Sequence, residues 1–299
     1  MSSFSIVVDT SCDLPQEFFT EYGIEIIPMP FDLDGMPHEM GYWQNISPKD
    51  YYDALRNGSI ATTSQINPIV YTMMFTEYAK QEKEAIFMIL SSGLSATYHN
   101  AVVALEEVKE SYPDCGIFVL DTINATCGFG LLMLMAVEKR EEGLSARETF
   151  EWLEARKHYL IGLFTVDDLM YLHRGGRLSK LSAIAGSVLN IKPLLNLAPD
   201  GSLALKEKVR GRTAAIEMIT SQVVRSMAPG TSPDTIVICH TDCSEYAQTL
   251  ADMLEAAVGV RRVIIAPMGP VIGAHIGPGS LTMIFEAGMT RTEYEERFY

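Results

Sequence analysis

Cysteine is scarce in this sequence, and its spacing predicts neither a disulfide framework nor a zinc site. The 299 residues include five cysteines, an odd number, and no two of them are spaced C-x-x-C. Disulfide-rich secreted domains and structural zinc sites both need paired, regularly spaced cysteines. We therefore expect buried free thiols, no bound metal and a reducing cytoplasmic location. The five are Cys12, Cys115, Cys127, Cys239 and Cys243.

Long apolar runs and an excess of positive charge are missing as well. No apolar run reaches the ~20 residues that a membrane-spanning helix needs, and the first residues lack the basic region of a signal peptide. Lys and Arg number 23 against 38 Asp and Glu, which gives a net charge of −15. Such an acidic chain is expected to bind no nucleic acid and to make at most transient contact with a membrane surface.

The usual motifs for nucleotide binding and hydrolysis are also absent. The sequence has no G-x-x-x-x-G-K-[ST] and no G-x-G-x-x-G, so a nucleotide would lack its common phosphate cradle. Residues 93–97 approach the G-x-S-x-G turn of serine hydrolases but lack the second glycine. His240, near Asp242 and Cys243, directly follows an apolar run, so a local hydrogen bond at a strand end explains it better than a metal site.

Length and patterning predict two α/β domains, residues 1–158 and 159–299. In the first domain, short apolar runs alternate with helical patterns, the order typical of a mainly parallel sheet between helices. We expect a helix over 14–22 with Asp13 as its N-cap, and another that starts at the capping box of Ser145 and Glu148. The strands are expected at 4–8, 24–28, 85–90 and 116–120.

The sequence pattern of the second domain predicts a mixed sheet with helices. Strands are expected at 160–165, 235–239 and 263–266, and Asp200-Gly201 is typical of a hairpin turn between two further strands. The charged residues from about Thr290 onward predict a loosely held end of the chain.

Basic residues gather in one stretch of this acidic chain. Residues 170–212 hold eight Lys and Arg against two acidic residues, Asp200 and Glu207. The stretch is either a solvated face or a docking site for phosphate or an acidic partner. The eight are Arg174, Arg177, Lys180, Lys192, Lys206, Lys208, Arg210 and Arg212.

Three polar clusters carry neutral hydrogen-bond donors that could hold one anion. They lie at 62–65, at 91–95 and at 273–279, and the first two precede expected helices, where backbone N–H groups are free. Each cluster alone is also explained as a helix cap or a turn. Together they contain no paired carboxylates, which favours holding a carboxylate over cleaving a bond. His275 is the one titratable side chain expected there, and a bound carboxylate would raise its pKa.

Several segments resemble the DegV family, in the same order along nearly the whole chain. Residues 7–15, 62–65, 90–98 and 121–122 are similar to its N-terminal motifs. Residues 171–178 contain its Arg-Gly-Gly-Arg turn, and residues 273–279 are similar to its C-terminal histidine and glycine segment. The sequence departs from the family at Ile66-Asn67, where Pro-Ser is usual, and at Ala96, where Gly is usual.

The resemblance implies a fatty-acid-binding protein made of two α/β domains with the ligand between them. Members serve as the lipid-binding subunit of bacterial fatty acid kinase and present the carboxylate to a separate ATP-dependent subunit, which makes the acyl phosphate for phospholipid metabolism. No further cofactor is implied, and the chain itself would not be the catalytic subunit. The residues implied for the carboxylate are Thr62, Thr63, Ser95 and His275, with Ser92 in addition, and those implied for docking the kinase are Arg174 and Arg210.

Two other functions remain open from the residues. One is a small-molecule hydrolase or transferase that uses Ser95 with His275, and the other is a lipid carrier or sensor without a kinase partner. The acyl length, the degree of unsaturation and the oligomeric state do not follow from the sequence.

Overall fold

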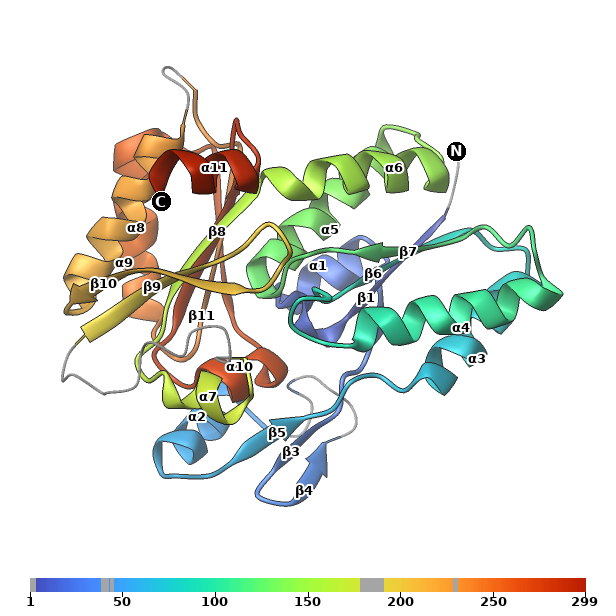
Figure 1. Cartoon of the computed structure of the whole chain (residues 1–299), viewed down its shortest axis with the longest axis horizontal. Coiled ribbons are helices and arrows are strands. Elements are labelled where there is room, and N and C mark those ends of the chain that lie inside the picture. The colour runs from blue at the N-terminus through green and yellow to red at the C-terminus, as the bar shows by residue number, and fades with distance from the viewer. Residues whose placement is uncertain (1–3, 39–42, 44–45, 178–190, 228–230) are drawn as a thin grey trace.

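Three β-sheets organise the part of the chain that the structure, a computed structural model, describes: residues 4–38, 43, 46–177, 191–227 and 231–299. The two larger sheets stand side by side, and the small third sheet lies below them in Figure 1. One large sheet is parallel and the other is mixed, so the predicted fold class of two α/β units is confirmed.

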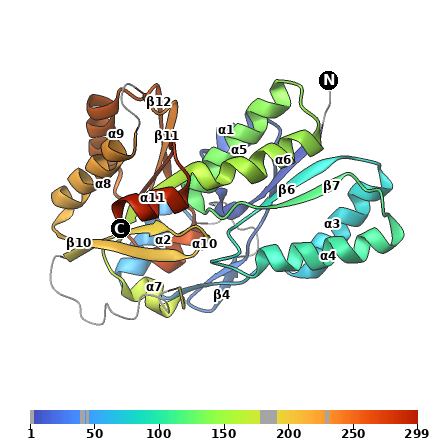
Figure 2. The ribbon, with the colours of Figure 1, turned by 45° about the horizontal axis from the view of Figure 1, so that its top comes forward.

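The first sheet is parallel, and helices cover both of its faces. Its strands, in spatial order, are β2 (Glu25–Ile27), β1 (Ser5–Asp9), β6 (Ala85–Ile89) and β7 (Ile117–Asp121). Alternate residues of a strand point to opposite faces. Val7 and Phe87 therefore pack toward α3 (Pro68–Lys80) and α4 (Thr97–Ser111), which lie side by side in Figure 2. The other face packs against α1 (Gln16–Glu21), α5 (Thr126–Glu141) and α6 (Ala146–Arg156).

The second sheet is mixed, and of its pairings only the one between β11 and β12 is parallel in the described residues. The predicted hairpin at Asp200-Gly201 joins β9 to β10. The strands of the second sheet, in spatial order, are β10 (Leu203–Arg210), β9 (Ile191–Leu197), β8 (Leu160–Thr165), β13 (Leu281–Glu286), β11 (Thr235–His240) and β12 (Arg262–Pro267). Its outer face packs against α8 (Arg212–Ser226), α9 (Ser244–Val258) and α11 (Arg291–Phe298).

Helix α5 is the element that the two large sheets share. From Thr126 to Val137 every residue except Leu134 is buried, because one side contacts β1 and another contacts β11 and β13. A helix that is apolar on all sides belongs between two layers, and the apolar composition of α5 fits this place. In the described part of the chain, no helix is both long enough and apolar enough to cross a bilayer.

The small third sheet was not predicted, and the helix packed against it ties the first half of the chain to the second. The hydroxyl of Tyr51 donates to the Pro270 carbonyl at 2.8 Å, and that of Tyr52 donates to the Met268 carbonyl at 2.7 Å. The elements of this region are β3 (Phe31–Leu33), β4 (Met36–His38), β5 (Ala61–Thr63), α2 (Pro48–Arg56), α7 (Met170–Arg174) and α10 (Pro270–Ile276).

The proposed domain division falls within the short 3-10 helix η2 (Lys157–Tyr159), between the last strand of the first sheet and the first strand of the second. The contacts of α2 with α10 cross that division. The limits at 158 and 159 stay a prediction.

Asp13 is not the N-cap of the helix that follows it, contrary to the sequence prediction. It follows the 3-10 helix η1 (Thr10–Cys12) in a left-handed conformation, with φ 42°, and helix α1 begins later, at Gln16. Its Oδ1 accepts a hydrogen bond from the Gly269 N–H at 2.8 Å, at the start of α10. Burial raises the pKa of the Asp13 carboxyl to about 8. A long-range contact therefore explains this residue better than its local pattern.

The end of the chain is not loosely held, which corrects a second prediction. Thr290 and Glu293 form a capping box for α11, and Arg291 is 2% exposed. Its guanidinium donates to the carbonyl oxygens of Leu160 and Ile123, both at 2.8 Å. The segment is rich in charged residues, as exposed chain ends are, but the Arg291 side chain points inward and binds buried backbone carbonyls.

Two further differences concern the C-terminal motif. The segment around His275 is not a turn but the helix α10, and the apolar run that follows it is the central strand β13. The glycines favoured a turn around His275, and the sequence analysis made no prediction for the run that forms β13. They permit close packing instead: a Cβ at Gly273 would lie 2.5 Å from the Tyr52 hydroxyl oxygen.

Candidate functional site

A cavity of about 770 Å³ lies between the two large sheets, within the ~300–1,000 Å³ usual for small-molecule sites. Both halves of the chain line it, and its described lining residues include neither Asp nor Glu. Most of the wall is apolar. The apolar residues include Leu90, Phe164, Leu172, Val271, Ile276 and Ile284.

Strands β8 and β13 form part of this wall. Gly162 pairs directly with Ile284, and both line the cavity. A Cβ built at Gly162 would lie 2.9 Å from Ile284 Cδ1. Because position 162 carries no side chain, the isoleucine can fold over the strand and the space beside it stays open.

The structure brings Thr63, Ser92, Ser95 and His275 to the same cavity, as the sequence analysis expected. Thr63 Oγ1 and His275 Nε2 are 2.7 Å apart, although 212 residues separate them along the chain. Ser95 Oγ and Thr97 Oγ1 are 2.9 Å apart at the start of α4. This end of the cavity therefore carries hydroxyl groups and an imidazole.

Thr62 is not part of this group in the structure. It is exposed and is not among the cavity's lining residues. Strand β5 pairs with β3, so its successive side chains alternate between two faces. The Thr63 side chain faces His275, and Thr62 lies on the opposite face of β5.

The His275 imidazole is neutral at pH 7. Burial and the nearby Arg177 charge lower its pKa to about 4. Its Nδ1 is buried and has no hydrogen-bond partner among the described residues. Gly175 of the Arg-Gly-Gly-Arg turn lies so close that a Cβ there would collide with Nδ1. That turn therefore covers the ring, which explains its first glycine.

Arg177 is a site residue that the sequence analysis did not single out. It lines the cavity, and its Nε donates to the Leu94 carbonyl at 3.2 Å, beside Ser95. A second nitrogen, Nη1, donates to the Gly175 carbonyl. Burial lowers the pKa of the guanidinium. His275 is thus not the sole titratable group of the site. The Arg-Gly-Gly-Arg turn sets Arg174 and Arg177 apart from the other basic residues of the stretch, but its sequence does not show which of the two arginines lines the cavity.

The acidic residues at the ends of β1 and β7 hold the serine segment in place. Asp9 Oδ2 accepts a hydrogen bond from the Leu90 N–H at 2.9 Å, and Asp121 Oδ1 accepts one from the Ser92 N–H at 3.1 Å. Both strands are parallel to β6, so their carboxyl ends meet at one edge of the sheet. These aspartates act as backbone anchors and hold Ser92 and Ser95 at the cavity, whereas the Ser91 hydroxyl is buried and donates to the Gly201 carbonyl at 2.9 Å.

Ser95 and His275 lack the contact of a nucleophile with its base. Among the described residues, His275 Nε2 contacts Thr63 and Ser95 Oγ contacts Thr97. A serine nucleophile is normally within hydrogen-bond reach of its base. This geometry disfavours the hydrolase alternative.

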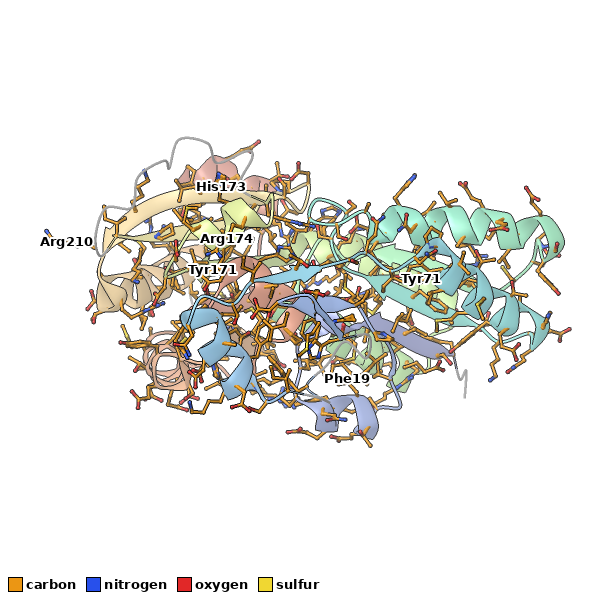
Figure 3. The ribbon with its side chains drawn as sticks, turned by 90° about the horizontal axis from the view of Figure 1, so that it is seen from below. Phe19, Tyr71, Tyr171, His173, Arg174 and Arg210 are labelled. Carbon is orange, nitrogen blue, oxygen red and sulfur yellow. The ribbon has the colours of Figure 1, made fainter. Side chains whose placement is uncertain are left out.

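The basic stretch divides into paired and exposed residues. Lys192 and Arg212 both form ion pairs with Asp167, and Lys206 pairs with Glu295. Arg174 and Arg210 are exposed, and Figure 3 shows them well apart. Lys180 lies outside the described residues. Acidic residues beyond the stretch therefore neutralise part of it.

Arg174 has an aromatic neighbour that fixes its position. Its guanidinium lies 4.7 Å from the centre of the Tyr171 ring, and the Tyr171 hydroxyl donates to the Leu55 carbonyl at 3.1 Å. The arginine is therefore held at the surface of the turn that covers His275.

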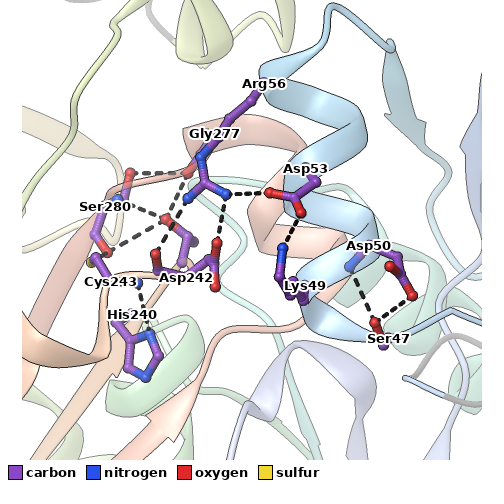
Figure 4. Close-up of polar contacts among 11 residues, drawn as sticks. Ser47, Lys49, Asp50, Asp53, Arg56, His240, Asp242, Cys243, Gly277 and Ser280 are labelled. Atoms are coloured by element: carbon purple, nitrogen blue, oxygen red, sulfur yellow. Dashed lines mark hydrogen bonds and ion pairs between the residues drawn. The ribbon is translucent and has the colours of Figure 1, made fainter.

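His240 has the local hydrogen bond that its place at a strand end predicts. Its Nδ1 accepts from the Cys243 N–H at 3.3 Å (Figure 4). In the same view Arg56 bridges Asp53 at 2.9 Å and Asp242 at 2.5 Å, and so joins α2 to the loop after β11. The described residues contain no cluster of three His, Cys, Asp or Glu that could hold a metal ion. All five cysteines are free thiols.

A family model described as "Uncharacterised protein, DegV family" matches residues 3–287. The chain belongs to the DegV family. A DegV domain-containing protein of Clostridium perfringens is 35% identical over 285 residues, which cover 95% of this chain and 98% of that protein.

Solved structures of DegV proteins share the fold over nearly the whole chain. A Thermus thermophilus DegV-family protein described as fatty-acid binding has a TM-score of 0.83 at 28% identity, over 95% of this chain and 99% of the other. A Bacillus subtilis DegV described as a fatty acid binding protein has a TM-score of 0.82 at 27% identity, over 96% and 100%. Fatty-acid binding is thus a property of DegV proteins similar to this one.

Proposed function

We propose that this DegV chain binds one long-chain fatty acid in the cavity between its large sheets. The observation that carries the proposal is the cavity itself: an apolar wall that ends in hydroxyls, a neutral imidazole and one arginine, with no acidic residue among those described. Burying a sixteen-carbon tail is worth on the order of 10 kcal/mol at ~0.8 kcal/mol per methylene, before ordering costs. The fatty acids that similar DegV proteins bind support the same ligand class.

Thr63, Ser95 and His275 would hold the carboxylate, with Ser92 beside them at the edge of the site. The hydroxyls can donate to carboxylate oxygens, and neutral His275 can donate from one ring nitrogen while it accepts at the other. Thr62 is left out of this set because it is exposed on the other face of β5.

The second part of the proposal is that the chain presents this carboxylate to a separate ATP-dependent kinase subunit in the cytoplasm. The absence of nucleotide motifs from its sequence supports a division of labour between two proteins. The exposed guanidinium of Arg174, on the turn over His275, and that of Arg210, on β10, would contact the kinase. The chain then contributes binding and orientation, and the partner contributes the nucleotide.

The ligand is tested by extraction. Purified protein is denatured, extracted with organic solvent and analysed by mass spectrometry. We expect about one fatty acid per chain, and delipidated protein should take up palmitate to the same ratio. Protein that carries no lipid and binds no palmitate would overturn the proposal.

The kinase step is tested on lipid-loaded variants. Arg174→Ala and Arg210→Ala should keep their fatty acid and lose most ATP-dependent acyl phosphate formation with the partner kinase. Lys80→Ala, at the C-terminal end of α3, removes a basic residue elsewhere and is the matched control. Normal acyl phosphate formation by both arginine variants would contradict the docking role, and a wild-type protein whose bound fatty acid is never phosphorylated would be a carrier or sensor.

A further inference from the structure

Strand β7 is an outer edge of the parallel sheet and lacks the features that protect such edges. In the described residues it pairs with β6 on one side and with no strand on the other. Charged residues, proline, bulges or a very short strand usually block an open edge, which otherwise attracts another strand. From Ile117 to Leu120 the strand contains no charged residue and no proline. Its side chains therefore do not oppose pairing with a further strand.

The other outer strands of the two large sheets carry such protection. Strand β2 has three residues and begins with Glu25. In β10, residues 206–208 are all charged, and the pairing with β9 shifts its register beside them. Strand β12 begins with Arg262 and ends with Pro267. Strand β7 is thus the exception among the described outer strands of these sheets.

The hydrogen bonds at the two ends of β7 show which of its backbone groups face β6. At its start, the Ala85 N–H donates to the Gly116 carbonyl at 2.9 Å. At its end, the Thr122 N–H donates to the Ile89 carbonyl at 3.1 Å. Because the backbone groups of successive strand residues point to opposite sides, the even-numbered residues of β7 face β6 and the odd-numbered residues face outward.

The outward backbone groups of β7 belong to Ile117, Val119 and Asp121. Lys157 Nζ donates to the Asp121 carbonyl at 2.8 Å and so closes one end of the edge. At Ile117 and Val119 no described residue is hydrogen-bonded to the outward N–H or C=O. These two residues therefore offer donors and acceptors in extended conformation to a further strand.

A groove of about 600 Å³ gives access to this edge. It lies between α4 and α6, which flank β7 on opposite sides in Figure 1 and in Figure 2. Val102 and Leu105 of α4 form one wall, and the stacked rings of Phe118 and Phe150, with centres 5.3 Å apart, form the other. A single extended chain can enter between two helices, whereas the same edge of a second copy would bring its own α4 and α6 against them. The recess therefore favours a peptide over a second copy.

The rim of the groove is more acidic than basic. Its basic residues are Lys109 and Arg147, and the Arg147 guanidinium lies 5.3 Å from the centre of the Phe118 ring. A peptide with Lys or Arg beside its apolar residues would complement the acidic side of this rim. The acidic residues are all exposed: Glu84, Glu106 and Asp114.

We propose that the outer edge of β7 docks an extended peptide segment of a partner protein, which adds a strand to the parallel sheet. The segment is a short run of β-branched or aromatic residues with Lys or Arg beside it. Backbone hydrogen bonds to Ile117 and Val119 supply affinity, and the side chains of the segment point alternately toward α4 and toward α6. The groove shares no described lining residue with the cavity between the sheets, so this site is independent of the proposed fatty acid.

The test selects peptides without assuming their sequence. A phage library of random heptapeptides is selected on the full-length protein, and the enriched peptides, which should share the composition above, are synthesised. When such a peptide binds, amide hydrogen exchange followed by NMR should slow at Ile117 and Val119, whose N–H groups face the groove. It should change little at Phe118 and Leu120, whose N–H groups face β6.

Two variants of α4 test the position of the peptide. Val102→Lys places a charge in the wall and should weaken binding about tenfold or more, because the peptide would desolvate an unpaired ammonium group. Val103→Lys is the matched control, since Val103 is exposed on the same helix and does not line the groove. It should change the dissociation constant by less than about twofold.

If circular dichroism shows that Val102→Lys does not fold, peptides N-methylated at alternate amides replace it. Methylation of one set should abolish binding and methylation of the other should preserve it, because only alternate N–H groups of an added strand face β7.

The assignment is overturned if the library yields no binder, if bound peptides leave exchange at Ile117 and Val119 unchanged, or if folded Val102→Lys binds as well as Val103→Lys. A dimer in sedimentation velocity whose formation protects the same two amides would give the edge to a second copy and overturn it as well.

Discussion

The polar end and the apolar wall of the cavity are built from different kinds of structure. The polar end collects the residues that follow strands or belong to short helices: the segment after β6, the end of β5, and α10. The wall is made by strand residues such as Phe164 and Ile284 of the mixed sheet and by α5. Backbone donors and hydroxyls are free where regular structure begins or ends, whereas the middle of a covered sheet offers only side chains.

This difference suggests a division of tasks between the two regions. The polar end would fix the carboxylate and its chemistry, and the wall would set the length of the tail that fits. Changes in one region should then leave the property of the other intact, and the variants below test that separation.

The largest effect is expected from Arg291→Met, which loosens the junction between the two halves of the chain that together enclose both regions. Arg291 binds the carbonyls of Leu160 and Ile123 and also Asn124 Oδ1, within the loop that leads into α5. Loss of the guanidinium leaves buried carbonyls without donors, at ~1–3 kcal/mol each. We expect the free energy of unfolding to fall by roughly 3–5 kcal/mol in urea titrations.

Arg297→Met is the control for this variant, since it changes an exposed arginine on the same helix α11. It should alter the free energy of unfolding by less than ~0.5 kcal/mol. Equal effects of the two substitutions would show that the buried contacts of Arg291 contribute little.

The next effect is on the reaction at the polar end. His275→Ala removes the partner of Thr63 and a donor beside the reacting carboxylate. Loss of one preorganised donor typically costs ~100- to 1,000-fold in rate. Acyl phosphate formation with the partner kinase should fall by that factor, while most palmitate binding remains because the tail is untouched.

Thr62→Ala serves as the matched control, because it alters the neighbouring residue on the outer face of β5. The partner kinase should phosphorylate the fatty acid bound to this variant at the wild-type rate. A His275→Ala protein with normal turnover and a lower melting temperature would assign the histidine a purely structural role.

The His275 imidazole also predicts a pH dependence of intermediate size in the free energy of unfolding. In the unfolded chain its pKa is near the ordinary value of 6.5, and in the ligand-free fold it is about 4. Protonation therefore favours the unfolded chain, and the free energy of unfolding should fall as the pH drops from about 6.5 toward 4. The loss is at most about 3.5 kcal/mol, at ~1.4 kcal/mol per pKa unit.

Comparison of two variants isolates this contribution from that of other groups. His275→Gln should flatten the decline in that pH window, and His173→Gln, which changes an exposed histidine of α7, should not. Parallel pH profiles of the wild type and His275→Gln would contradict the lowered pKa.

The smallest effect concerns the apolar wall. Gly162→Val adds a side chain where a Cβ alone would lie 2.9 Å from Ile284 Cδ1. If the tail loses room for about two methylenes at ~0.8 kcal/mol each, affinity for a long acid should fall about tenfold relative to a shorter one. Displacement titrations with acids of different length measure that ratio, and an equal loss for both lengths would contradict the proposed role of the wall. His275→Ala should leave the ratio unchanged.

Much of the fold was predictable because its signals are local. Buried parallel strands need continuous apolar runs, and helix starts need caps such as that of Ser145 and Glu148, so both can be read from a few adjacent residues. The misplaced cap at Asp13 and the strand β13 show the limit of this reasoning, since each depends on partners far away in the chain. The small third sheet escaped prediction because its strands are only three residues long.

The sequence by itself determined the fold class, the family and the kinds of polar residue available to the site. Tertiary structure alone decided which of them meet. It turned Thr63 toward His275 and Thr62 away from it, because neighbouring residues of a strand face opposite sides. It also chose Arg177 from eight basic residues, because a side chain's charge acts on a ligand only where folding has brought the two within a few ångströms.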